Sequence, residues 1–227
     1  MLTQANLNIP ILISRLVVLV IAFAVHEFAH AWTADHFGDD TPRSQGRLTL
    51  NPMAHLDPVG TLLLLVFGFG WARPVMVDPS RLGRRNFMLV ALAGPLSNLI
   101  MAVFASSFVW VGLLTINLTP SGAFFPTTFD LVAQFVFINL LLMLFNLIPL
   151  APLDGEKIIS YFLPPEGQDI MDRIRPYGFM ILMAFLFLFR GAFNFVIGQP
   201  LSFLYGVLFF NPSVSSFLQG TLLKIFM

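Results

Sequence analysis

The stretch IPILISRLVVLVIAFAVHEFAHAW, residues 9–32, decides the fold of this chain. A helix rises about 1.5 Å per residue, so this stretch can cross a hydrocarbon core of about 30 Å with some tilt. No basic flank precedes it, and cleavage behind its apolar part would remove the polar residues near its end. We therefore interpret it as a retained first span and not as a signal peptide. The chain is predicted to be an integral membrane protein.

The composition agrees with lipid as the main solvent. Of the 227 residues, 57% are hydrophobic and 11% are charged, whereas soluble domains have about 45–50% apolar and about 25% charged residues. The formal net charge is zero and no dense run of Lys or Arg is present. We therefore expect the lipid bilayer, but no nucleic acid, as a partner. The length suits several spans without a further soluble domain, so residues 1–227 are predicted to form a single transmembrane domain.

More apolar stretches follow the first one, at residues 56–71, 87–116, 129–150, 177–197 and 201–226. The stretch 56–71 is short and rich in Gly and Pro, so a re-entrant or hairpin-like segment fits it better than a straight crossing. The predicted fold is an all-α polytopic membrane protein with about five to six hydrophobic segments. A re-entrant or β-hairpin element would lie between the first and second full spans. The core would cover about residues 9–160, and C-terminal helices about residues 176–227.

Basic residues in short loops predict the orientation, because they mark the cytoplasmic side of a membrane protein. Here they follow the first stretch, precede the stretch 87–116 and follow the stretch 129–150, whereas residues 117–128 contain none. One topology satisfies this pattern: the first span ends in the cytoplasm, and the stretch 56–71 returns to the side it left. His30 and Asp154 would then both lie at the cytoplasmic side. We expect the membrane to be the cell (inner) membrane of a prokaryote.

The segment His26-Glu27-Phe28-Ala29-His30 has the spacing of a metal site. Its two His are about 40° apart on a 3.6-residue helix, so both imidazoles can reach one metal ion. Glu27 could take a proton from metal-bound water and pass it to a leaving amine. A chance pattern with a salt-bridged Glu is the plain alternative. Ionisable groups inside a span cost about 2.5–3.5 kcal/mol per charge on insertion scales, which favours a functional site.

The third metal ligand must come from elsewhere in the chain. A catalytic zinc usually takes three protein ligands, and a chain without Cys must use His or a carboxylate. His36 lies on another face of the helix and is interpreted as an interfacial residue, whereas His55 is conceivable. Asp154 is favoured because Pro149 and Pro152 break the preceding span, and the glycine that follows permits a tight turn. A plain turn at the membrane surface is the alternative for this Asp-Gly pair.

These motifs together resemble the site-2 protease family of intramembrane zinc metalloproteases. The resemblance is carried by HEFAH in an early span and by Asn146 with Leu153-Asp154-Gly155 near the end of a later one. The segments NPMAHLDPVG (51–60), GWARPV (70–75) and AGPLSN (93–98) agree with further family motifs. The similarity covers roughly residues 20–160, and the part after Tyr161 carries no recognised motif. It implies a short, core-only member without PDZ or CBS domains.

The resemblance implies one Zn²⁺ per chain and a role for each matching position. His26, His30 and Asp154 match the zinc ligands of the family. Glu27 matches its catalytic base, and Asn146 matches the residue proposed to stabilise the tetrahedral oxyanion. For Asn146, a polar residue that bridges the broken backbone is the alternative.

Other positions could assist from the re-entrant segment. His55 and Asp57 could support the metal ligands from behind or supply a second oxyanion donor, and a capping and turn role is the alternative. The hairpin around Trp71, Pro74 and Val75 would hold an extended substrate as an added strand, which is the arrangement that the family implies.

An enzyme of this kind would act on single-span membrane proteins or on signal-peptide remnants, and the oligomeric state stays open. A metal or proton transporter that uses the same His and Asp residues is the main alternative, although it has no need of Glu27 and no inverted repeat is apparent. An inactive scaffold and a membrane protease with HExxH and a downstream Glu are further alternatives. Asn98 and Arg190 are expected to bond within the helix bundle.

Overall fold

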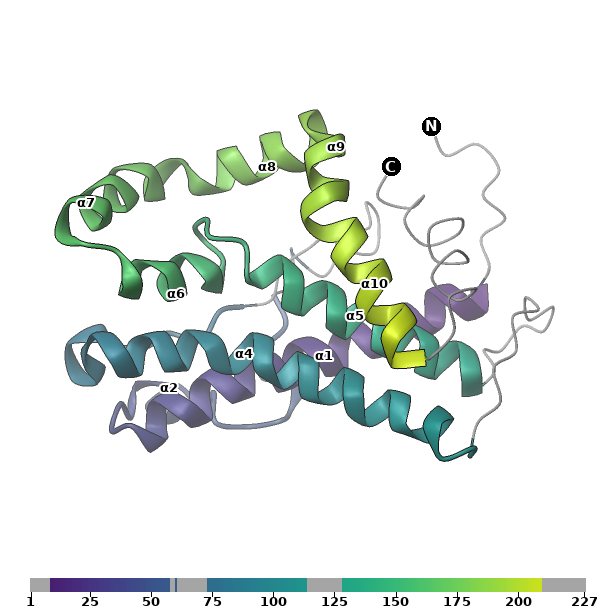
Figure 1. Ribbon diagram of the computed structural model, residues 1–227. Coiled ribbons are helices and arrows are strands. Elements are labelled where there is room, and N and C mark those ends of the chain that lie inside the picture. Colours follow the sequence, from purple (N-terminus) through teal and green to yellow (C-terminus); the bar gives the residue numbers. More distant parts are fainter. Residues whose placement is uncertain (1–8, 58–59, 61–72, 114–127, 210–227) are drawn as a thin grey trace.

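The computed structural model describes residues 9–57, 60, 73–113 and 128–209, and most of these are helical (Figure 1). No β-strand occurs among the described residues. The expected hairpin around Trp71 falls partly outside these ranges. Its described part, residues 73–77, is not assigned to a strand, so the hairpin stays a prediction.

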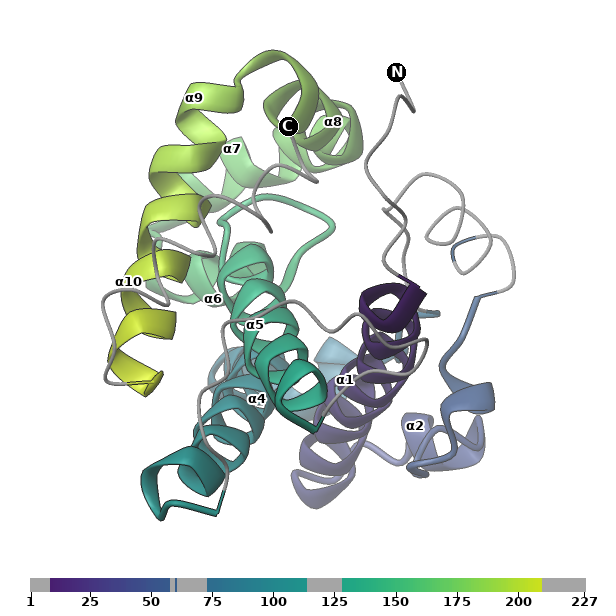
Figure 2. The ribbon, with the colours of Figure 1, turned by 90° about the vertical axis from the view of Figure 1, so that its right-hand side faces the viewer.

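Three long helices form the centre of the molecule: α1 (Ile9–His36), α4 (Pro79–Trp110) and α5 (Thr128–Asn146). Each packs against the other two, and Figure 2 shows them nearly end-on. The core between them combines small side chains such as Ala22 and Ala102 with larger ones such as Leu140. Small residues let helix backbones approach closely, which is how helices associate in lipid.

The lengths of the helices fit a membrane protein. Among the described residues, three helices are long and apolar enough to span a bilayer: Arg15–His36, Pro79–Trp110 and Gly191–Phe209. A shorter apolar helix covers Leu131–Asn146. The mainly helical, membrane-spanning class is confirmed, whereas the number of five to six segments stays a prediction.

The turn after α1 joins the end of this helix to the start of α4. The Asp39 carboxylate is fully buried and accepts hydrogen bonds from the Thr41 N–H at 3.0 Å and the Asp78 N–H at 2.7 Å. Burial raises the pKa of Asp39, but these hydrogen bonds and the charge of Arg81 outweigh that effect and hold the pKa below its ordinary value. The Asp39 carboxylate therefore binds both Thr41, the first residue of the short helix α2 (Thr41–Ser44), and Asp78, the residue before α4.

The residues that flank the stretch 56–71 lie together. A 3₁₀ turn, η1 (Pro52–Ala54), precedes this stretch, and the Arg73 N–H donates to the His55 carbonyl oxygen at 2.7 Å. Most of the stretch itself lies outside the described residues, so the re-entrant interpretation stays a prediction, with which the closeness of His55 and Arg73 agrees.

An arm of shorter helices follows the central three: α6 (Asp154–Phe162), α7 (Pro165–Ile174), the turn η2 (Arg175–Tyr177) and α8 (Gly178–Leu188). In Figure 1 this arm runs away from the end of α5 and back again. Its base is fixed by an ion pair between the Arg175 guanidinium and the buried Glu156 carboxylate at 2.6 Å. A Cβ at Gly178 would lie only 2.2 Å from the Ala151 carbonyl oxygen, so α8 begins in direct contact with the loop that precedes Asp154.

The last helices differ from the predicted segments 177–197 and 201–226. Helix α8 ends at Leu188, and the chain turns sharply at Phe189 (φ −110°, ψ 49°). After that turn α9 (Arg190–Phe193), a π-helical turn η3 (Asn194–Gly198) and α10 (Gln199–Phe209) run on as one helix. The predicted boundary between the stretches 177–197 and 201–226 therefore lies inside this helix, where the wider π-helical turn precedes Pro200, a residue without an N–H. Helix α10 packs on α5.

Candidate metal and catalytic site

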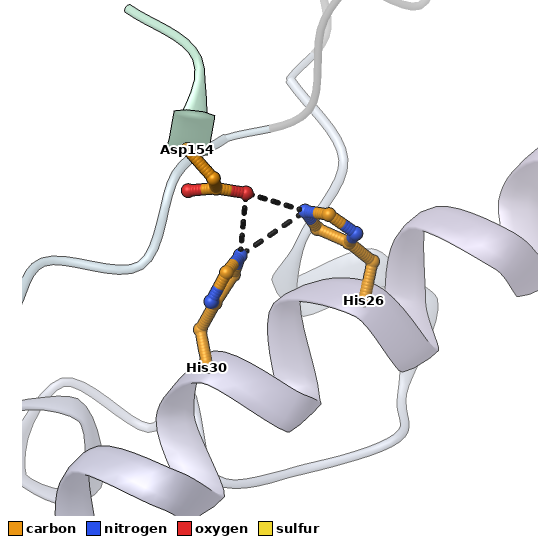
Figure 3. A group of neighbouring side chains, drawn as sticks. All are labelled: His26, His30 and Asp154. Atoms are coloured by element: carbon orange, nitrogen blue, oxygen red, sulfur yellow. Dashed lines mark hydrogen bonds and ion pairs between the residues drawn. The ribbon is translucent and has the colours of Figure 1, made fainter. Parts of the chain in front are cut away.

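Three buried side chains from two distant parts of the chain converge in the centre of the molecule (Figure 3). His26 and His30 lie one turn apart on α1, and Asp154 is the first residue of α6. The Asp154 Oδ2 lies 3.2 Å from the His26 Nε2 and 3.1 Å from the His30 Nε2. The two Nε2 atoms are 3.1 Å apart. The structure thus brings together the residues that the sequence suggested as metal ligands.

The triangle of ligand atoms fits a zinc ion. Zinc bonds to imidazole nitrogen and carboxylate oxygen at about 2.0–2.1 Å, so two ligand atoms at the tetrahedral angle are about 3.3 Å apart. The three separations of 3.1 to 3.2 Å are close to that value. Three ligands leave a fourth position free, as in catalytic zinc sites.

Each of the three side chains also forms a hydrogen bond through the polar atom that points away from the cluster. The His26 Nδ1–H donates to the Asn98 Oδ1 at 2.6 Å, and the His30 Nδ1–H donates to the Val90 carbonyl oxygen at 2.7 Å. The Lys157 ammonium donates to the Asp154 Oδ1 at 3.2 Å. These contacts leave the two Nε2 atoms and the Asp154 Oδ2 directed at one point. Such outer contacts fix ring orientation and ligand basicity in metal sites.

Two glycines allow the backbone to come this close. A Cβ on Gly94 of α4 would lie 2.3 Å from the His30 Nε2 and 2.6 Å from the His26 Cε1. A Cβ on Gly155 would lie 2.3 Å from the Ile148 carbonyl oxygen. Glycine at position 94 therefore sets the distance between α4 and the histidine pair. Glycine at position 155 lets the loop before Asp154 fold over the start of α6.

The loop between α5 and α6 carries Asp154 to the histidines. Helix α5 ends at Asn146, and the turns that follow include hydrogen bonds from the Leu150 N–H to the Ile148 carbonyl and from the Leu153 N–H to the Leu150 carbonyl. The sequence predicted a break of the span before Asp154, and the helix ends where that prediction requires. The chain then restarts as a helix at the ligand itself.

Glu27 lies beside the cluster and is itself held by the backbone. Its carboxylate is largely buried, and the Oε2 accepts a hydrogen bond from the Val75 N–H at 2.9 Å. Residues 73–78 form a strap that belongs to no helix and contacts α1 through the Val75 N–H. The strap is not assigned to a strand, but it brings Pro74 and Val75 to the base, close to where the sequence placed a substrate-binding hairpin. Trp71 lies outside the described residues.

A mainly apolar cavity of about 570 Å³ opens at the cluster. Asn146 lines it, and its Nδ2 donates to the Leu142 carbonyl at 3.0 Å. One wall comes from α8, so the C-terminal arm contributes to the cavity. Apart from the proposed ligands, Glu27 and Lys157 are its charged lining residues. The lining also includes Phe23, Pro74, Val75, Val77, Phe87, Val90, Ala91, Phe145, Pro152, Leu153, Phe179, Leu182, Met183 and Leu186.

Other candidates from the sequence lie away from the cluster. The buried His55 donates from its Nε2 to the Thr49 carbonyl at 2.7 Å, and the Asp57 Oδ1 accepts from the Gly60 N–H at 2.8 Å. Neither side chain lines the cavity. These contacts fit the capping and turn alternative. The supporting role of both residues at the metal site stays a prediction. His36 stacks on Trp32 with ring centroids 5.5 Å apart, outside the metal cluster.

Comparison with known proteins identifies the family. The model of peptidase family M50 matches residues 112–189, the part of the chain that carries Asn146 and Asp154. The protein YwhC of Bacillus subtilis (strain 168), named as a candidate zinc metalloprotease, is 45% identical over 174 residues, which are 74% of this chain and 77% of the relative. The chain belongs to peptidase family M50. This is the site-2 protease family that the sequence motifs resembled.

More distant M50 relatives carry the same description. Rip2 of Mycolicibacterium smegmatis, also named as a candidate zinc metalloprotease, is 30% identical over 173 residues, 74% of this chain and 64% of the relative. MJ0611 of Methanocaldococcus jannaschii, with a name of the same kind, is 30% identical over 158 residues, 69% of this chain and 74% of the relative. No solved structure matches the chain significantly. The protein is thus an M50 zinc metalloendopeptidase and an integral membrane protein.

Proposed function

We propose that this M50 enzyme hydrolyses peptide bonds within or next to the transmembrane segments of membrane-anchored substrates. The observation that carries the proposal is the position of the cluster. Its two histidines and the adjacent Glu27 are buried in α1, a helix long and apolar enough to span a bilayer. A site at that depth, with a mainly apolar cavity in front of it, is suited to a peptide that comes from the membrane.

The roles follow from the contacts. His26, His30 and Asp154 would hold one zinc ion per chain, which brings the pKa of a bound water to about 7 and polarises a carbonyl group. Glu27 takes the proton of the attacking water and gives it to the leaving amine. Its Oε2 is bound to the Val75 N–H, so its other carboxylate oxygen is the one available for the proton.

Asn146 is the proposed donor to the oxyanion. It lines the cavity together with Asp154, and only one hydrogen of its amide nitrogen is needed for the hydrogen bond to the α5 backbone. The second hydrogen is available to a developing negative charge. Removing a comparable donor in other hydrolases lowers kcat about 10²- to 10³-fold.

The substrates we propose are single-span membrane proteins and signal-peptide remnants. A membrane helix hides its carbonyl groups in internal hydrogen bonds, so the substrate must unwind before water can attack it. The strap at residues 73–78 is neither helix nor strand and reaches the base through Val75, which suits the binding of an unwound segment beside it. If replacing Pro74 and its neighbours left cleavage unaltered, substrate binding by this strap would be wrong.

We further propose that the site faces the cytoplasm, in the inner membrane of a prokaryotic cell, with five to six hydrophobic segments in total. Support comes from the basic residues, which gather where α1 ends, α4 begins and α6 lies. The Arg43 guanidinium pairs with Asp35, and the Arg84 Nη2 donates to the Tyr161 carbonyl of α6 at 3.1 Å. This end of the helix bundle is therefore the predicted cytoplasmic side.

Reconstituted protein tests this proposal. Wild-type protein and the Glu27→Gln variant are placed in liposomes with a single-span substrate, and the products are mapped by mass spectrometry. We expect a cut within or next to the transmembrane segment for the wild type and none for Glu27→Gln. Zinc uptake into the liposomes is measured in parallel. Uptake that does not depend on Glu27, without any cleavage, would favour a transporter.

A further inference from the structure

A line of buried amides runs behind the proposed ligand His26 and crosses the three central helices. The Asn98 Oδ1 of α4 accepts the hydrogen bond from the His26 Nδ1 at 2.6 Å, and the Asn98 Nδ2 donates to the Asn139 Oδ1 of α5 at 2.9 Å. The Asn139 Nδ2 in turn donates to the Phe135 backbone carbonyl at 2.8 Å. Both asparagines have no exposed surface. The sequence singled out Asn98 as a helix-bridging residue and overlooked Asn139.

The far end of this line dictates the polarity of every hydrogen bond in it. The Phe135 carbonyl can only accept, so Asn139 must present its NH₂ group there and its carbonyl oxygen to Asn98. Asn98 must then present its NH₂ group to Asn139 and its oxygen to His26. That oxygen can only accept, so the hydrogen of the neutral imidazole lies on Nδ1. The Nε2 lone pair is then left for the metal.

We propose that Asn98 and Asn139 are positioning residues that fix His26 as its Nδ1–H tautomer and thereby prepare the zinc site. A backbone carbonyl on α5 sets, through two amides, which nitrogen of a histidine on α1 can bind zinc. The reverse tautomer would place a lone pair against the Asn98 oxygen. Turning Asn98 would pair its NH₂ group with that lone pair, but it would place the Asn98 oxygen against the Asn139 Oδ1, which can only accept. Full burial leaves no room for solvent to rescue either arrangement.

The proposal extends the zinc chemistry of the site and rests on the assignment of His26 as a ligand. It does not depend on the substrate, because a tautomer prepared in advance acts on metal affinity. Changing the outer partners of metal-bound histidines typically costs 10- to 100-fold in affinity or activity. Asn139 touches neither the metal site nor the cavity, so an effect of substituting Asn139 on zinc affinity would have to pass through Asn98.

Zinc affinity of the full-length protein in detergent, measured by competition with a chelator, tests the proposal without a protease assay. Asn98→Leu and Asn139→Leu remove the line, whereas Asn98→Asp keeps an acceptor for the imidazole hydrogen. The control is Ser106→Ala, because Ser106 is also fully buried on α4 but bonds only to the Val103 carbonyl of its own helix. Thermal unfolding of the zinc-free proteins reports on folding.

We expect both leucine variants to bind zinc about 10- to 100-fold more weakly. Asn98→Asp should bind it about as tightly as the wild type, since its carboxylate still accepts the Nδ1 hydrogen although it cannot donate to the Asn139 Oδ1, and Ser106→Ala should bind it unchanged. Wild-type affinity in folded leucine variants would overturn the proposal and leave the amides as links between helices. If a leucine variant does not fold, Asn98→Asp decides: because it keeps the acceptor for the Nδ1 hydrogen, an affinity about 10-fold or more below that of the wild type contradicts the proposal. Failure of membrane proteolysis alone would not change these results.

Discussion

Replacing Gly94 with alanine should destroy the metal site while adding only one methyl group. Gly94 lies on α4 directly against the two histidines of α1. The added Cβ would lie 2.3 Å from the His30 Nε2, 2.5 Å from its Cε1 and 2.6 Å from the His26 Cε1. Two of these three atoms belong to the ring of one proposed zinc ligand and the third belongs to the other.

The size of the effect follows from the contact distances. Non-bonded heavy atoms pack at about 3.5 Å, so the new Cβ is roughly 1.2 Å too close to the His30 Nε2. Zinc ligands must keep their distances to within about 0.2 Å. Either the rings move out of ligand position, or α4 backs away and loses its hydrogen bonds to both rings. Overpacking costs about 1–3 kcal/mol, and since 1.4 kcal/mol is a factor of ten, we expect zinc affinity to fall about 100-fold.

The assay is a chelator competition on purified Gly94→Ala protein, with zinc content determined by elemental analysis. Gly191→Ala is the matched control, because that glycine is also helical and a Cβ there would meet nothing within 4 Å. We expect the control to bind zinc as the wild type does. A Gly94→Ala protein with wild-type affinity would refute the close approach of α4 to the ligands.

Three further predictions concern contacts around the site. Val75→Pro removes the N–H that holds Glu27. Since a hydrogen bond to a charged group contributes about 1.5–3 kcal/mol, kcat should fall about 10-fold or more with zinc content unchanged. The control Val75→Ala keeps the N–H, so its kcat should stay within about threefold of the wild-type value. The depressed pKa of Asp39 stabilises the fold above its ordinary value of about 3.9, and this stability is lost as the pH falls through the folded-state pKa. In Asp39→Asn the melting temperature should therefore fall less steeply with decreasing pH in the acid range than in the wild type. An unchanged dependence of the melting temperature on pH would contradict that role. Arg175→Met leaves the Glu156 carboxylate buried without its partner and, since Arg175 is half exposed, should cost about 1–2 kcal/mol. Adding Glu156→Gln should restore most of that loss in thermal unfolding.

The sequence predicted the metal cluster well because its signals are local. His26 and His30 have a spacing that one helix turn explains, and prolines before Asp154 predict the broken helix that brings it near. Contacts that depend on the docking of one helix against another could not be foreseen. Nothing in the sequence says that Gly94 touches the histidines, or that Asn139 continues the hydrogen bonds of Asn98, although an asparagine in the middle of an apolar span is a signal for a buried partner.

The C-terminal helices show the opposite case, in which the local pattern misled. The apolar stretches 177–197 and 201–226 predict a boundary between residues 197 and 201, but a π-helical turn there lets the helix continue. The break occurs instead at Phe189, a residue without any breaking tendency of its own. Packing of α10 on α5, with the Tyr205 hydroxyl donating to the Ala133 carbonyl at 3.2 Å, fixes the position of the last helix. Tertiary contacts therefore decide this boundary.

Zinc content and cleavage of a membrane substrate, measured on the same preparations of wild type, Glu27→Gln and Asp154→Ala, test the proposed roles most directly. We expect one zinc per chain and cleavage for the wild type. We expect one zinc without cleavage for Glu27→Gln, and loss of both for Asp154→Ala. Cleavage by Glu27→Gln, or a full complement of tightly bound zinc in Asp154→Ala, would refute these roles.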